Sequence, residues 1–155
     1  GINYTILRPS IIYGKGSTGF NIIIEKINKI PFFTPIIGNG KYRISPVQIS
    51  DVIKSIEKAI ENKNPDKKEY DLVGGSNIFF IDLINILKKE TGNKKINIHI
   101  PIWACNLISI CFPNIIRKNN IKNLTEDSSA NIENAKKDFD YNPIKFEGGI
   151  KNGIL

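Results

Sequence analysis

The chain has 155 residues, of which 41% are hydrophobic and 24% are charged, and this balance indicates a folded globular protein and excludes a disordered one. The net charge is +7, but only three of the 22 basic residues are arginine, and no aromatic residues are interleaved among the lysines. We therefore expect a solvated lysine surface and no nucleic-acid partner.

In chain order, residues 3–12 form a β-branched run that predicts a strand ending at Arg8-Pro9. A glycine-rich loop follows, and residues 20–29 have the apolar spacing of a helix. Prolines and glycines make residues 32–50 loop with short strand pieces. Ser50 or Asp51 is the expected cap of the next helix.

The second half continues the alternation of strands and helices. The pattern predicts a strand over 69–75, a helix that begins at Ser76 or Asn77 and ends near Gly92, and a strand over 95–102. An apolar helix is expected over 103–112, followed by short helices over 128–138 and 147–153. This order favours the α/β class.

Two segments, Tyr4–Leu7 and Tyr70–Val73, look like strands of a buried parallel sheet. Two strands do not make a stable parallel sheet, so we expect the remaining strands to come from residues outside this sequence. The sequence begins with Gly1 directly before a strand and contains no methionine. Both observations favour a fragment of a longer protein.

Cys105 and Cys111 lie six positions apart in a predicted helix, a spacing that suits neither a disulfide nor a metal site. They favour a reduced, cytoplasmic protein, and the single His99 is expected to be structural, so no metal site is predicted. The apolar run Ile98–Ile116 contains two prolines and falls short of a spanning helix. It is a candidate surface for a membrane-associated partner.

The loop YGKGSTG carries Gly14, Gly16 and Gly19 in the order G-x-G-x-x-G, which raises the possibility of a dinucleotide pyrophosphate site. That motif also needs an acidic residue about 20 positions further on, to hold the ribose hydroxyls. Residues 34–45 contain no aspartate or glutamate. We therefore predict that this loop faces a ligand without holding a pyrophosphate.

The blocks TILRPSIIYGKG, GNGKYRISPVQISDV, EYDLVGG, NLTED and FDYNPIKFEGGI, read together, carry a family resemblance. The chain resembles the carboxyl-terminal half of extended short-chain dehydrogenase/reductases, the NAD(P)-dependent sugar-nucleotide epimerase/dehydratase group. It looks closest to the atypical branch that includes an accessory subunit of respiratory complex I.

The resemblance implies the carboxyl-terminal part of a Rossmann-type doubly wound parallel sheet, with a small, mostly helical substrate-binding subdomain. The sheet would take in approximately residues 1–19 and 51–75, and the substrate-binding part approximately residues 20–50 and 76–155. The implied cofactor is NAD or NADP, with an incomplete site in this sequence.

Site residues also follow from the resemblance. The family's nicotinamide-lining segment matches Pro9, Ser10, Ile11 and Ile12. Its substrate-facing positions match Tyr13, Asn21, Ile36 and Arg43. A salt bridge or a solvated turn is the alternative for Arg43. Ile11 stands where many members have asparagine, and this departure favours an atypical substrate.

No catalytic residue is expected. In the family the Tyr-x-x-x-Lys pair lies upstream of the LRP strand, and the sequence holds only Tyr141 and Lys145 at that spacing, with Pro143 between them. The chain alone is therefore expected to be inactive, and two functions remain open. One is the substrate-binding portion of an enzyme that transfers a hydride at a hydroxyl-bearing carbon, with a nucleotide sugar as one candidate. The other is a non-catalytic binding or assembly protein, with a homodimer or a membrane-associated partner.

Overall fold

The computed structural model describes residues 4–61, 68–105 and 130–151, which fall into two compact units. Unit 1 comprises residues 1–22, 45–77 and 129–155, and unit 2 comprises residues 23–44 and 78–128. The helix α1 (Thr18–Lys29) contributes its first residues to unit 1 and the rest to unit 2. The chain therefore passes repeatedly between the units.

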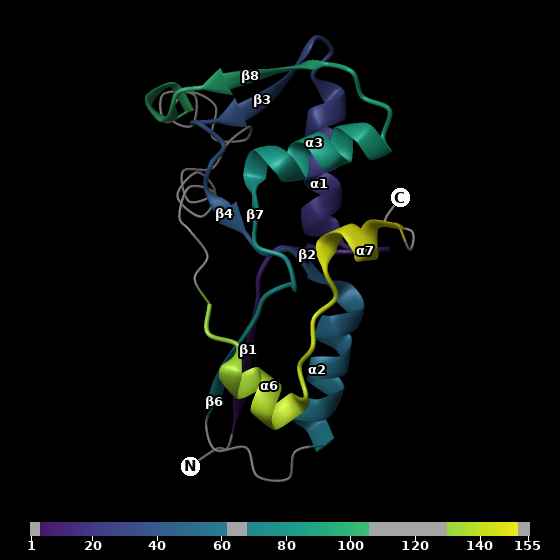
Figure 1. The fold of residues 1–155 in the computed structure, drawn as a ribbon, viewed down its shortest axis with the longest axis vertical. Coiled ribbons are helices and arrows are strands. Elements are labelled where there is room, and N and C mark those ends of the chain that lie inside the picture. Colours follow the sequence, from purple (N-terminus) through teal and green to yellow (C-terminus); the bar gives the residue numbers. More distant parts are fainter. Residues whose placement is uncertain (1–3, 62–67, 106–129, 152–155) are drawn as a thin grey trace. The chain divides into compact units, whose positions relative to one another are not determined.

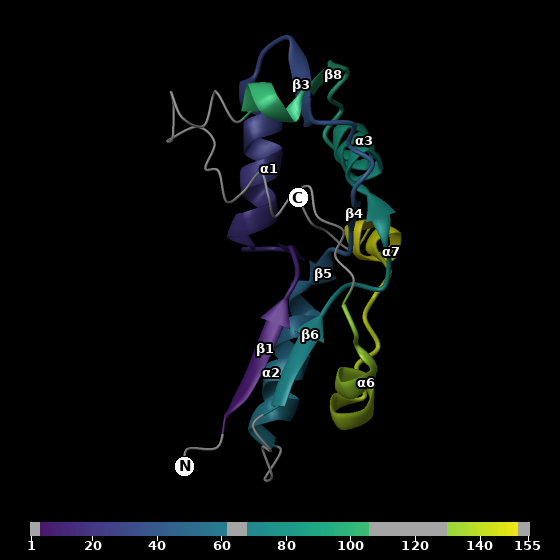
Figure 2. The ribbon, with the colours of Figure 1, turned by 90° about the vertical axis from the view of Figure 1, so that its left-hand side faces the viewer.

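Unit 1 contains two short parallel strand pairs. Strand β1 (Thr5–Pro9) pairs with β6 (Lys68–Leu72), and Figure 2 shows them side by side. Strand β2 (Ile12–Tyr13) pairs with β5 (Val47–Gln48), which runs directly into helix α2 (Ile49–Glu61). The strands predicted around residues 4–7 and 70–73 are confirmed, and the α/β class with them.

One face of the β1–β6 pair carries the core of unit 1, beside α2 and the short helix α6 (Glu133–Phe139). The buried side chains of this core are Val47, Val52, Tyr70, Leu72, Ala135, Phe139 and Tyr141. Between these residues the strands place charged side chains, since successive residues of a strand point to opposite faces. Arg8 on β1 pairs there with Glu69 and Asp71 of β6, at 2.7 and 2.9 Å.

Helix α2 is amphipathic, and its apolar face packs against the core of unit 1. Val52 and Ser55 are buried and Ala59 packs against the core, at the spacing of one helix face.

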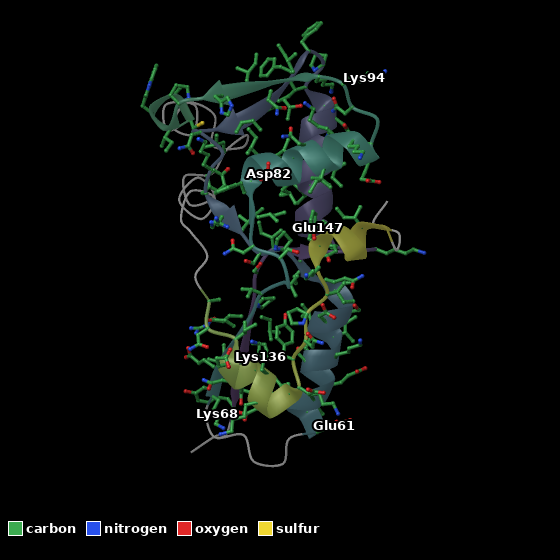
Figure 3. The ribbon with its side chains drawn as sticks, viewed as in Figure 1. Glu61, Lys68, Asp82, Lys94, Lys136 and Glu147 are labelled. Atoms are coloured by element: carbon green, nitrogen blue, oxygen red, sulfur yellow. The ribbon has the colours of Figure 1, made fainter. Side chains whose placement is uncertain are left out.

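The last helix of unit 1, α7 (Phe146–Lys151), carries Glu147 near its start, while Lys136 lies on α6 (Figure 3).

Unit 2 also contains two strand pairs. Strand β3 (Phe33–Ile37) runs parallel to β8 (Ile96–Ile100), and β4 (Arg43–Ile44) runs antiparallel to β7 (Ile78–Phe79). Figure 1 shows β3 and β8 next to each other. Helix α3 (Phe80–Glu90) follows β7 and buries Phe80, Leu83, Ile84 and Leu87.

Helix α3 begins at Phe80, later than the predicted start at Ser76 or Asn77. Ile78 and Phe79 are taken into the pairing with β4, so they adopt extended backbone. Ser76 serves another element: its hydroxyl donates to Glu147 at 3.0 Å and accepts the backbone N–H of Phe146 at 3.1 Å. The polar residue before the helix therefore fastens α7 instead of capping α3.

Of the predicted apolar helix over 103–112, residues 103–105 are helical, and the remainder, with Cys111, lies outside the described residues. Cys105 is buried. Among the described residues, no helix is both long and apolar enough to cross a membrane, and no cluster of three potential metal ligands occurs.

Candidate functional site

The four predicted cofactor-binding residues lie together where β1 ends, and this is the edge at which parallel sheets place their ligands. Pro9 is exposed, and Ser10, Ile11 and Ile12 are half-buried. The N–H of Ser10 donates to the carbonyl of Leu72 at 3.0 Å, so the segment continues the pairing of β1 with β6. The N–H of Val47, the first residue of β5, donates to the carbonyl of Ile11 at 3.0 Å and so connects the segment to β5.

A second segment closes this edge from the side of β6. The carbonyl of Ser45 accepts bonds from the hydroxyl of Ser10 and, at 3.0 Å, from the N–H of Gly74. A Cβ on Gly74 would lie 1.7 Å from the carbonyl oxygen of Pro46. Only glycine permits this approach, which explains the glycine after the strand in EYDLVGG.

Tyr13 lies at the end of β2 and is completely buried within unit 1. Its ring meets Phe146 edge to face, with centroids 5.0 Å apart, and a Cβ on Gly149 would lie 2.2 Å from its hydroxyl oxygen. Burial, with the nearby carboxylates of Asp51 and Glu147, raises the pKa of Tyr13 to about 12. The hydroxyl is therefore protonated at neutral pH, and its predicted contact with substrate stays a prediction.

The glycine loop after Tyr13 has a structural use. Gly14 and Gly16 have φ values of 127° and 84°, a region that other residues avoid. A Cβ on Gly14 would lie 2.7 Å from the side chain of Ile49, the first residue of α2. Ser17 closes the turn: its N–H donates to the carbonyl of Gly14 and its hydroxyl donates to the carbonyl of Ile12, both at 3.0 Å. Asn21 follows on α1.

The other two predicted substrate residues, Ile36 and Arg43, belong to unit 2, whereas the residues above belong to unit 1. Ile36 is fully buried on β3, so it presents no accessible surface to a ligand in this structure. Arg43 is exposed on β4, and its guanidinium carbon lies 4.6 Å from the ring centroid of Phe79 on β7. This cation–π contact orients the guanidinium.

The sequence analysis missed the part played by Asp51. Helix α2 begins at Ile49, so Asp51 lies inside its first turn and does not cap it. The carboxylate of Asp51 is buried and accepts the backbone N–H of Ile144 at 2.9 Å. The available signal was an aspartate directly before the apolar pair Val52-Ile53, but the sequence does not show its distant partner.

Tyr141 and Lys145 do not form a catalytic pair. Tyr141 is buried, and its hydroxyl donates to the carbonyl of Val73 at 2.9 Å, while Lys145 is exposed. Burial and, to a smaller extent, Asp51 raise the pKa of Tyr141 above its usual range. A phenol held in this way is a poor general acid or base at neutral pH.

The residues at the end of β1 fit one end of a nicotinamide dinucleotide. A nicotinamide ring and its carboxamide would need apolar contact and a few polar groups, and Pro9, Ile11 and Ile12 with the hydroxyl of Ser10 are of the right kind for both. The ribose end has no acidic partner at the expected distance after the glycine loop.

Comparison with known proteins places this geometry in a known fold. No family model and no curated protein sequence matches the chain. Solved structures do match. A UDP-glucose 4-epimerase from Thermotoga maritima, solved with UDP-glucose, aligns over 97% of this chain with a TM-score of 0.69 and 23% identity. The chain has the fold of part of that enzyme.

Two further enzymes agree. A dTDP-glucose 4,6-dehydratase from Streptomyces venezuelae, solved with NAD, aligns over 99% of this chain with a TM-score of 0.72 and 16% identity. A UDP-glucuronic acid 4-epimerase from Bacillus cereus, also with NAD, aligns over 92% with a TM-score of 0.64 and 19% identity. This chain covers only 44%, 43% and 40% of the three proteins in the order given.

Proposed function

We propose that the chain is the carboxyl-terminal, substrate-binding portion of an NAD(P)-dependent epimerase or dehydratase that acts on a nucleotide sugar. The complete protein would transfer a hydride to or from a hydroxyl-bearing carbon. The observation that carries the proposal is the alignment of nearly the whole chain with part of several nucleotide-sugar epimerases and dehydratases.

The strand ends supply the proposed contacts. The segment Pro9–Ile12, where β1 ends, would line the nicotinamide ring, because parallel strands present their carboxyl ends to ligands. Asn21, on α1, would approach the sugar, whereas Tyr13 is fully buried and would support the loop from inside unit 1. Taken by itself, unit 2 offers the guanidinium of Arg43 as a candidate contact for phosphate oxygens, since its planar fork suits them.

Calorimetric titration of the chain with UDP-glucose tests this proposal. We expect saturable binding, which Arg43→Ala weakens about tenfold because it removes a charge-assisted phosphate contact. Arg8→Ala is the matched control: it removes the same charge from a residue paired with Glu69 and Asp71 in unit 1. Absence of binding at millimolar UDP-glucose, or equal loss in both variants, contradicts the proposal.

A second candidate, a non-catalytic assembly protein, is favoured by the exposed apolar side chains of unit 2. Phe32, Ile96 and Trp103 are 82%, 67% and 67% exposed. Ile96 and Ile98 lie on the same face of the β3–β8 pair, and both are exposed. Large exposed apolar groups of this kind suit a protein interface.

Sedimentation velocity of the chain tests the second candidate. An assembly protein that forms homodimers through this face should sediment as a dimer at micromolar concentration, and Ile96→Lys should make it monomeric. Ile60→Lys, which changes a 79% exposed isoleucine of α2 in unit 1, serves as the control. A wild-type monomer at all concentrations excludes the homodimer.

A further inference from the structure

A pocket of about 490 Å³ lies in unit 2, where strands β3 and β8 both end. Its lining residues are Gly38, Asn39, Lys41, Ile81, His99 and Pro101. Gly38 and Pro101 each follow the last residue of a strand, and Ile81 belongs to the first turn of α3. The volume falls within the range of small-molecule sites, and parallel strands place ligands at this edge.

The backbone around the pocket is fixed by its own hydrogen bonds. The N–H of Gly38 donates to the carbonyl of Ile100 at 2.8 Å, and the N–H of Ile81 donates to the carbonyl of Gly40 at 3.1 Å. Gly38 and Gly40 adopt φ values of 62° and 67°, which let the chain turn back within three residues. The pocket is thus formed by the turn between β3 and β4, which a backbone hydrogen bond joins to the start of α3.

The polar groups of the pocket are oriented. The Nδ1 of His99 lies 3.0 Å from the carbonyl oxygen of Gly38, and a carbonyl only accepts, so Nδ1 carries the hydrogen. The other ring nitrogen, Nε2, then accepts in the neutral ring and donates in the imidazolium. The side-chain oxygen of Asn39 accepts the N–H of Lys41 at 2.9 Å, which leaves its NH₂ group as the donor end. The ammonium of Lys41 adds a positive charge.

The rest of the lining is apolar. Ile81 and the ring of Pro101 offer carbon surfaces that suit the apolar part of a small molecule. We propose that this pocket binds a small anion carried on a flat apolar ring, such as an aromatic carboxylate, through Lys41 and His99. In the pairing of β3 with β8, Ile36 lies opposite His99 and Ile37 lies opposite Ile100. Successive residues of a strand point to opposite faces, so the side chains of His99 and Ile37 lie on opposite faces of this strand pair.

Nuclear magnetic resonance tests the proposal directly, because the sequence contains a single histidine and its imidazole signals belong to His99 alone. The chain is titrated with benzoate and, separately, with benzyl alcohol, which keeps the ring and lacks the charge. We expect saturable imidazole shifts with benzoate and binding at least about fivefold weaker with benzyl alcohol. No saturable shift, or equal affinities, overturns the proposal.

Two lysine variants decide whether the charge acts locally. Lys41→Ala is expected to weaken benzoate binding about fivefold, since the ammonium is exposed and partly screened. Lys89→Ala removes the same charge from the last turn of α3, about 12 Å along the axis from Ile81, and should leave binding unchanged. Equal weakening in both variants overturns the proposal.

Competition distinguishes this pocket from the nucleotide-sugar site proposed above. A saturating concentration of UDP is expected to leave the benzoate titration of His99 unchanged. Displacement of benzoate by UDP would assign the pocket to the nucleotide and overturn the proposal of a separate site. Failure of UDP-glucose to bind at all would contradict the proposed function and leave the benzoate result standing.

Discussion

The buried carboxylate of Asp51 accepts the backbone N–H of Ile144 at 2.9 Å, across 93 positions of the sequence. This bond joins the first turn of α2 to the segment that leads into α7. Since Asp51 is buried and Ile144 is half-buried, removing either group leaves the other with little access to a replacement partner. The bond therefore fastens the carboxyl-terminal segment of unit 1 to the helix that follows β5.

Asp51→Ala is expected to lower the free energy of unfolding by about 2 kcal/mol, because the N–H of the half-buried Ile144 loses its acceptor. Asp51→Asn retains a side-chain oxygen and should cost less. Asp82→Ala is the control, since Asp82 also lies in the first turn of a helix but is exposed. Urea unfolding measures all three, and equal losses for Asp51→Ala and Asp82→Ala would contradict the interpretation.

Gly74→Ala is expected to destabilise unit 1 by more than about 3 kcal/mol. Its Cβ would overlap the carbonyl oxygen of Pro46 and force apart the backbone that joins β6 to Ser45. Gly148→Ala changes a helical glycine whose Cβ would meet only Ile144 at 4.0 Å, so it should stabilise the protein by up to about 1 kcal/mol. Thermal unfolding followed by circular dichroism compares the two, and a neutral Gly74→Ala would refute the close approach.

The hydroxyl of Tyr70 donates to the carboxylate of Asp138 at 2.7 Å, and Lys68 lies 3.0 Å from the same oxygen. The bond from Tyr70, followed by the one from Lys68, lowers the pKa of Asp138 below its usual 3.8. A lowered carboxyl pKa contributes stability above pH 3.8 that is lost as the pH falls through the folded-state value. Tyr70→Phe should therefore cost about 1 kcal/mol at neutral pH and make the loss below pH 3.8 smaller.

Urea unfolding at a series of acidic pH values tests this expectation. Tyr4→Phe is the matched control, because Tyr4 is 46% exposed and no hydrogen bond to Asp138 involves it. An acid limb of the same slope in Tyr70→Phe and in the wild type would show that the bond from Tyr70 does not set the pKa of Asp138.

Much of the fold could be predicted from the sequence because it rests on local patterns. Periodic apolar residues revealed α2 and β8, and the β-branched run before Arg8-Pro9 revealed β1. The pairing of β4 with β7 involves two residues on each strand, too few for a periodic pattern. The late start of α3 follows from that pairing, so the local sequence pattern did not predict it either.

The candidate site was less accessible to prediction, because its side chains are positioned by residues distant in the sequence. Tyr13 reads as the tyrosine of a loop, and its burial depends on Phe146 and Gly149, more than 130 positions away. His99 reads as one residue of an alternating strand, and its orientation depends on the carbonyl of Gly38. Contacts of this length leave no mark in a local pattern.

The alkaline limb of stability provides a last prediction, on Tyr13. Burial raises its pKa to about 12, against 10 for a tyrosine in water, so the unfolded chain releases this proton first as the pH rises. The folded state is therefore most stable, relative to the unfolded state, below pH 10 and loses stability between pH 10 and 12. Tyr13→Phe removes this group and should flatten the limb in that interval. Guanidinium unfolding at stepped alkaline pH measures the slope, and an unchanged slope would show that folding does not raise the pKa of Tyr13.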